Sequence, residues 1–159
     1  MLKDTLKRLY IRDLTKLIQE LLLYKEEEHI WSIQGEILNS AGNLCLHLIG
    51  NLNAYVGAEL GNTGYIRNRA GEFSLKNISR NKLITELKNT VSMVEEVIEN
   101  LSDEQLNSEY PQIVLNEKTS TTYFLVHLAM HLSYHLGQVN YHRRLVQHPG
   151  LKRKAPLLF

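Results

Sequence analysis

The stretch HLAMHLSYHLGQVNYHRR, from His127 to Arg144, contains four of the seven histidines in this chain of 159 residues. Three of them, His127, His131 and His135, recur every four residues among Leu, Ala, Met and Tyr. Residues four apart in an α-helix lie on one face, about one turn above each other. The stretch therefore predicts a helix with a histidine-bearing face, which is the first indication of a metal site.

Apolar residues at helical spacing predict four long helices, at roughly residues 3–25, 35–59, 79–101 and 121–146. The middle of the second, GNLCLHLIGNLN, is apolar almost all round and is expected to be deeply buried. We expect Ser79 to cap the third helix.

Two further features concern the segments between these helices. SDEQ, beginning at Ser102, fits a capping box and predicts a short extra turn at 102–106. Ser120 or Thr121 is expected to cap the fourth helix. The segments 61–78, with three glycines, and 107–119, with Pro111, are expected to be long connections.

Four helices with almost no strand signal predict an all-α fold, a four-helix bundle whose long connections permit crossovers. We expect one domain over residues 1–146, followed by a C-terminal tail at 147–159. The tail contains two prolines and a glycine and is expected to leave the helix at once.

Composition excludes several classes of partner. The net charge is +1, so no overall field favours nucleic acid or an anionic membrane. No segment has the length and apolarity of a membrane span or of a signal peptide. Cys45 is the single cysteine, so no intramolecular disulfide can form, which suits a reducing compartment. A cytoplasmic protein is the expectation.

The histidine spacing limits which residues can share one ion. His127 with His131, or His131 with His135, can offer two imidazoles to the same metal. His127 and His135 are separated by a rise of about 12 Å along the helix and cannot do so. Spacing alone leaves both adjacent pairs open.

A catalytic ion usually takes three protein ligands and keeps one position open. The best candidate for the third ligand is His47, which lies within the apolar part of the second helix, although a hydrogen-bonded core histidine remains the simpler alternative. His29, His142 and His148 are weaker candidates. HLAMH lacks the glutamate of a zinc peptidase, and paired glutamate motifs of di-iron bundles are absent.

Three stretches resemble one family in the order in which they occur. HLAMHLSYHLGQVNYHRR resembles the fourth-helix signature of the DinB-like, or YfiT-like, superfamily of metal-dependent enzymes. LNSAGNLCLHLIGNLNAYV, at 38–56, is similar to its second-helix motif, and YIRNRAGEF, at 65–73, resembles an element of one branch. The resemblance implies an up-down-down-up bundle, often a homodimer, in which His47, His131 and His135 hold a divalent metal. Imidazole ligands suit zinc, nickel, copper or iron(II), and of these Zn, Ni or Fe(II) is expected.

The resemblance also implies a class of reaction. The better-understood relatives are bacillithiol S-transferases and a mycothiol-dependent isomerase. A thiol S-transferase-like enzyme or a hydrolase is therefore expected, acting on a small-molecule electrophile with a low-molecular-weight thiol or water as the nucleophile at the ion. No protein side chain is assigned a catalytic role. The alternative is a non-catalytic dimeric helical bundle with a structural metal or none.

Four residues are expected around the ligands. His127 becomes an extra residue on the same stripe, packing beneath the site without binding the ion. Gln138 lies three residues after His135 and either orients its ring or is an ordinary polar residue. Asn43 and Asn51 lie one turn on either side of His47. They either reach a bound water or substrate or make hydrogen bonds between helices at a close crossing.

The remaining candidates have plain structural alternatives. Gly137, in mid-helix, predicts a close approach of another helix. Arg67 and Arg69 either bind an anionic substrate or belong to a loop that is solvated or paired with Glu72. Cys45 points away from His47 and is expected to be an inert buried thiol. The basic run at 152–154 is expected to be solvated.

Overall fold

The computed structural model describes residues 2–147, and all statements on structure refer to them. These residues form no strand, and their only β-type pairs are two isolated bridges within 109–120. The all-α class expected from the sequence is confirmed for this part of the chain. No helix within it is long and apolar enough to cross a lipid bilayer. The expected tail conformation, His148 and the basic run lie outside the described residues.

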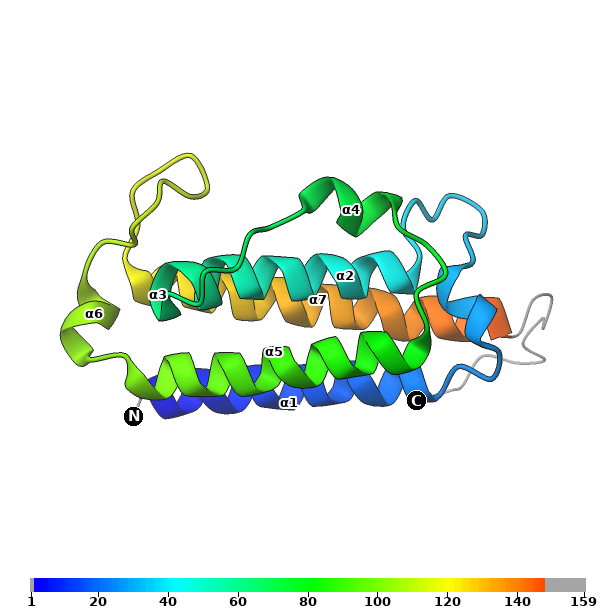
Figure 1. Ribbon diagram of the computed structural model, residues 1–159, viewed down its shortest axis with the longest axis horizontal. Helices are drawn as coiled ribbons and strands as arrows, with labels where there is room; N and C mark the ends of the chain where they lie inside the picture. The colour runs from blue at the N-terminus through cyan, green and yellow to red at the C-terminus, as the bar shows by residue number, and fades with distance from the viewer. Residues whose placement is uncertain (1, 148–159) are drawn as a thin grey trace, which may run out of the picture.

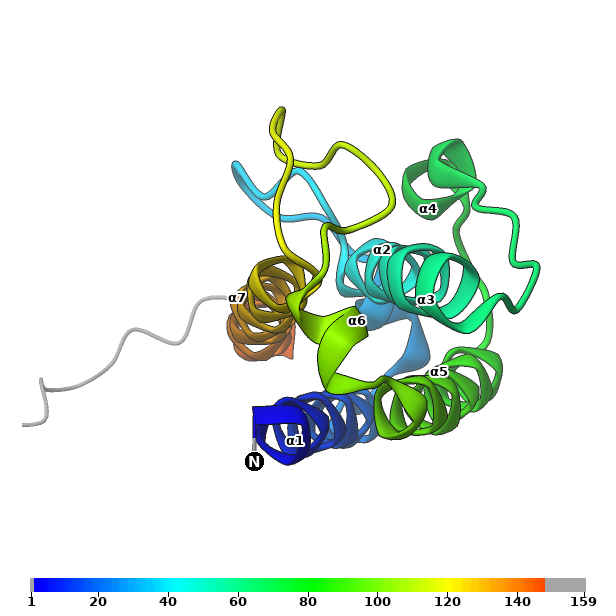
Figure 2. The same ribbon diagram turned by 90° about the vertical axis from the view of Figure 1, so that its left-hand side faces the viewer.

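Four long helices lie side by side: α1 (Leu2–Leu22), α2 (Ala41–Leu52), α5 (Arg80–Asn100) and α7 (Thr121–Gln147) (Figure 1). Helices α1 and α2 each pack against both α5 and α7, and the end-on view in Figure 2 shows the four around a common interior. Along the long axis, α1 and α7 run in one direction and α2 and α5 in the other. Helix α2 thus has α7 as a direct neighbour.

The start of the second helix was predicted wrongly, because α2 begins at Ala41 and not near residue 35. Gly35 has a positive φ of 57°, which an α-helix does not allow, and Ser40 is extended. The Ser40 hydroxyl accepts a hydrogen bond from the backbone N–H of Asn43 at 3.2 Å and caps the helix. Leu38, expected on the helix, is 85% exposed.

The second helix does not end as a regular α-helix. It continues from α2 through a π-helical segment, η2 (Asn53–Ala58), into α3 (Glu59–Gly61). The Asn53 amide donates to the carbonyl of Ile49 and to the hydroxyl of Thr90 on α5, both at 2.9 Å. The wider π turn is thereby fixed to α5 at the end of the helix that carries His47.

Besides η2 and α3, three shorter helices occur in the connections along the chain: η1 (Glu27–Trp31), α4 (Arg69–Ser74) and α6 (Asp103–Asn107). The capping box before α6 is confirmed, since the side chains of Ser102 and Gln105 bond to each other's backbone N–H. The cap of α5 by Ser79 is also confirmed. Helix α4 was not expected. It lies across the outer side of α2, within what was predicted to be an irregular connection (Figures 1 and 2).

The glycines show where the fold is tight. A Cβ on Gly42 would lie 2.6 Å from the Trp31 ring, so the close approach at that position is made by an aromatic side chain. A Cβ on Gly137 would meet nothing within 4 Å. The expected helix approach at Gly137 is therefore wrong within the chain, and the nearby Tyr134 and Tyr141 are 65% and 69% exposed.

Candidate metal centre

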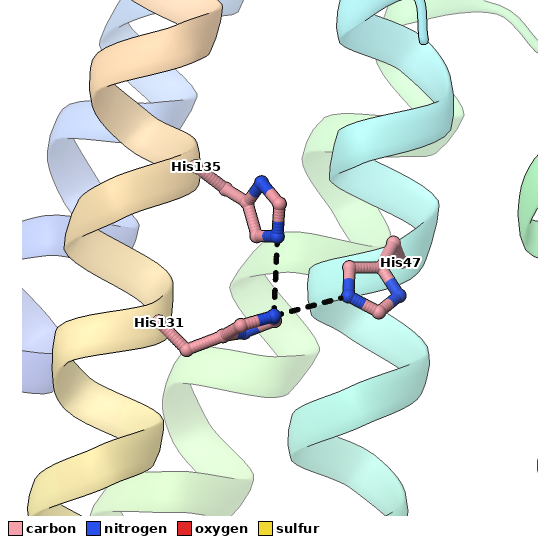
Figure 3. A group of neighbouring side chains, drawn as sticks. All are labelled: His47, His131 and His135. Carbon is pink, nitrogen blue, oxygen red and sulfur yellow. Dashed lines mark hydrogen bonds between the residues drawn. The ribbon is translucent and has the colours of Figure 1, made fainter. Parts of the chain in front are cut away.

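Three histidines from two facing helices converge, His47 from α2 and His131 and His135 from α7 (Figure 3). The Nε2 atom of His131 lies 3.2 Å from Nε2 of His47 and 3.1 Å from Nε2 of His135. Ligand atoms of all three lie within 4.8 Å of one another. Of the two pairs that the spacing left open, the structure brings His131 and His135 to His47.

These distances suit ligands of a single ion. Imidazole nitrogens bind zinc at about 2.0–2.1 Å, so two of them in a tetrahedral arrangement lie about 3.3 Å apart. The two short separations observed here, 3.1 and 3.2 Å, are close to that value.

The protonation of the rings also favours a cation between them. The Nδ1–H group of His47 donates to Glu72 Oε2 at 2.9 Å, and that of His135 donates to Gln138 Oε1 at 2.6 Å. If both rings are neutral, Nε2 of His47 and Nε2 of His135 each carry a lone pair, and both atoms lie close to Nε2 of His131. One ring nitrogen cannot donate a proton to both, whereas a metal ion accepts all three lone pairs.

Burial favours the neutral form of the His47 and His131 rings. It lowers the pKa of His47, and it lowers the pKa of His131 to about 4, where the neighbouring His135 and His47 act in the same direction. The neutral imidazole is the form that binds metals, so neither ring has to lose a proton near neutral pH.

Glu72 is the site residue that sequence reasoning did not identify as such. Its carboxylate is 5% exposed and accepts from Arg67 Nε at 2.7 Å and Arg67 Nη2 at 2.9 Å, in addition to the bond from His47. The Arg67–Glu72 pair was one of the alternatives predicted from the sequence, and it is observed. A Cβ on Gly50 would collide with Glu72 Oε1, so the carboxylate lies directly against the backbone of α2.

Asn43 supports Glu72 and does not face the site. Its amide nitrogen donates to the carbonyls of Glu72 and Leu75, at 3.0 and 2.9 Å, and its oxygen accepts from the Ser40 hydroxyl at 2.7 Å. Asn43 is 2% exposed. Of the two alternatives predicted for Asn43, the structure therefore favours hydrogen bonds between helices, because its amide fastens α4 to α2.

A cavity of about 410 Å³ opens beside the cluster and has His47 and His131 in its wall. Asn51 and His127 also line it. The His127 ring stacks on Phe124, with centroids 5.9 Å apart, and lies 6.4 Å from the His131 ring. It is outside the group of three, as the resemblance implied, and it forms part of the cavity wall.

The other described histidines and the cysteine have different surroundings. His142 is buried, accepts from the Tyr24 hydroxyl at 2.7 Å and donates to the Ser32 carbonyl at 2.8 Å. It is thus a hydrogen-bonded core residue. Cys45 is fully buried, and burial raises the pKa of its thiol to about 12. It is an unreactive core thiol, as expected.

A family model described as "Protein of unknown function (DUF1572)" matches residues 2–153. The chain belongs to the DUF1572 family. No curated protein matches it. The match covers the whole region in which the DUF1572 chain brings His47, His131 and His135 together.

Proposed function

We propose that the chain is a divalent-metal-dependent enzyme of the DinB-like kind, built as an up-down-down-up four-helix bundle. Two observations support the architecture. The long helices run in the order of directions that this topology requires (Figure 1). The three stretches that resemble the superfamily supply the second helix, the connection after it and the fourth helix.

The convergence of three Nε2 atoms beside a cavity carries the proposal. His47, His131 and His135 would hold the ion, and within residues 2–147 no further His, Cys, Asp or Glu joins this group. Three protein ligands with adjoining space are typical of catalytic sites, whereas structural zinc sites are closed by four. The donor set suits Zn, Ni or Fe(II).

The chain's own residues orient the ligands. Glu72 accepts the Nδ1–H of His47 and fixes its ring and tautomer, and Arg67 holds Glu72 through two hydrogen bonds. Gln138 does the same for His135. These bonds keep both Nε2 atoms free for a cation.

We propose that the nucleophile comes from outside the protein. Among residues 2–147, no cysteine, serine or threonine lines the cavity, and Cys45 is buried elsewhere. A divalent ion lowers the pKa of a thiol or water that it binds, which makes either an effective nucleophile near neutral pH. We therefore propose transfer of a low-molecular-weight thiol to a small electrophile, or hydrolysis.

Metal analysis of the purified chain tests the first step. We expect one divalent ion per chain, its loss in His47→Ala and His131→Ala, and its retention in the neighbouring control His127→Ala. Absence of a stoichiometric ion from wild-type protein supplied with Zn²⁺, Ni²⁺ and Fe²⁺ would contradict the proposal.

Turnover tests the second step. The loaded protein is assayed for consumption of cysteine or glutathione with 1-chloro-2,4-dinitrobenzene, and for hydrolysis of 4-nitrophenyl acetate. We expect one of these activities to depend on His131. An ion that is retained with no metal-dependent turnover of any electrophile would favour a structural site.

A further inference from the structure

Two of the three clustered histidines have their second ring nitrogen bonded to protein, and the third does not. Nδ1 of His47 donates to Glu72, and Nδ1 of His135 donates to Gln138. Nδ1 of His131 is buried, and no hydrogen-bond partner for it exists within residues 2–147. Histidines that bind a metal almost always donate this second N–H to an acceptor. His131 therefore needs an acceptor that the described side chains do not supply directly.

The tautomer of His131 determines what kind of partner its Nδ1 atom needs. Its Nε2 atom lies 3.2 Å from Nε2 of His47 and 3.1 Å from Nε2 of His135, so Nε2 is the nitrogen that would bind the ion. A neutral imidazole that offers Nε2 to a metal carries its proton on Nδ1. Nδ1 of His131 is then a buried donor, and buried donors are nearly always hydrogen-bonded.

Asn51 has the opposite requirement. It lies one turn beyond His47 on α2 and is 7% exposed, and its Oδ1 atom is buried without a hydrogen bond in the described part of the chain. Asn43, one turn on the other side of His47, has its amide bonded to protein through three hydrogen bonds. The Asn51 oxygen is thus a buried acceptor that needs a donor.

The cavity beside the cluster brings the two requirements together. His131 and Asn51 both line it, together with His127, whereas His135 does not. The cavity therefore borders the cluster on the side of Asn51, and its volume of about 410 Å³ gives ample room for ordered water. A water molecule both accepts and donates hydrogen bonds, and buried waters commonly bridge polar groups that have no other partner.

We infer that Asn51 is a positioning residue for the metal ligand His131 and acts through one buried water. The water accepts a hydrogen bond from His131 Nδ1–H and donates one to Asn51 Oδ1. This bridge fixes the ring and tautomer of His131, as Glu72 and Gln138 fix those of the other two ligands. The inference rests on the proposed function, because the proton is fixed on Nδ1 when Nε2 holds the ion.

Nuclear magnetic resonance of the zinc-loaded, ¹⁵N-labelled full chain tests the bridge directly. We expect an observable His131 Nδ1–H signal with a rotating-frame Overhauser cross-peak to water. The signal should broaden or disappear in Asn51→Leu, which removes the acceptor at similar size, and persist in Asn51→Asp, which keeps an acceptor. An absent wild-type signal, one without contact to water, or one unchanged in Asn51→Leu would overturn the inference.

Zinc affinity, measured by competition with a chromophoric chelator, supplies the second readout. We expect Asn51→Leu to lower the affinity about tenfold and Asn51→Asp to keep it at or above that of wild type. Asn89→Leu makes the same chemical change on the exposed side of α5 and is expected to have no effect. A folded Asn51→Leu protein that binds zinc within about twofold of wild type would overturn the inference. So would an equal loss in His127→Phe, which would assign the acceptor to the His127 ring.

The outcomes separate this inference from the proposed function. A wild-type chain that takes up no zinc would remove both the metalloenzyme and the role of Asn51. Zinc uptake with an affinity that does not depend on Asn51 would remove the positioning role alone. Zinc binding that depends on Asn51, without metal-dependent turnover, would keep the positioning role and favour a structural site.

Discussion

Replacement of Glu72 by glutamine tests how the ligand His47 is held. The carboxylate accepts one hydrogen bond from His47 Nδ1 and two from Arg67, and it is 5% exposed. Glutamine keeps the size but removes the charge, so it weakens the hold on the tautomer that leaves Nε2 unprotonated. Loss of such a partner typically lowers metal affinity about 10–100-fold, or about 1.4–2.8 kcal/mol.

The measurement is zinc affinity by competition with a chromophoric chelator at neutral pH. The control is Glu96→Gln, which makes the same chemical change on the exposed side of α5. We expect the control to match wild type, since Glu96 lies away from the cluster. A Glu72→Gln protein that folds and binds zinc within about twofold of wild type would refute a supporting role for this carboxylate.

Four further results are expected. Gly50→Ala should weaken zinc binding about tenfold, because the added Cβ displaces the Glu72 carboxylate, even though alanine favours a helix more than glycine does. Unchanged zinc affinity in the same competition assay would contradict this. The free energy of urea unfolding of the metal-free protein should decrease as the pH falls below 7. Burial lowers the pKa of His142, so the unfolded chain binds the proton at a higher pH than the folded chain does. The decrease should be smaller in His142→Gln. The Cys45 thiol should react with Ellman's reagent in guanidinium chloride and not in the folded protein, because it is buried and its pKa is raised. The homodimer implied by the resemblance is expected to use the exposed apolar face of α7, so Met130→Glu or Tyr134→Glu should convert a dimer to a monomer in sedimentation velocity.

Most of the histidine cluster could be predicted because the spacing of residues within one helix determines which of them share a face. His131 and His135 had to share a face once the stretch was helical, and His47 stood out because the residues around it are apolar. The resemblance was needed to choose between the two histidine pairs. The bond between Gln138 and His135 was also within reach, since a spacing of three residues suffices for it.

The contact between the Glu72 carboxylate and His47 could not be predicted from the spacing of residues within one helix. Glu72 lies 25 residues from His47, and their contact depends on the folding of α4 across α2. The wrong start of the second helix has a similar origin, because apolar residues at 37 and 38 continue the helical spacing although Gly35 and Ser40 have conformations that exclude it. Spacing records where a helix would be amphipathic, whereas caps and positive φ angles decide where it begins.

The fixing of Glu72 from several sides affects how this protein can vary in length. Connections of this size usually absorb inserted residues without consequence. Here the position of the six-residue helix α4 is fixed by three contacts: the Arg67 side chain, the Asn43 amide and the close packing against Gly50. An insertion between residues 67 and 75 would move the Glu72 carboxylate away from His47. A graft of this loop into another protein therefore has to include residues 67–75 unchanged, together with the part of α2 from Asn43 to Gly50 that they contact.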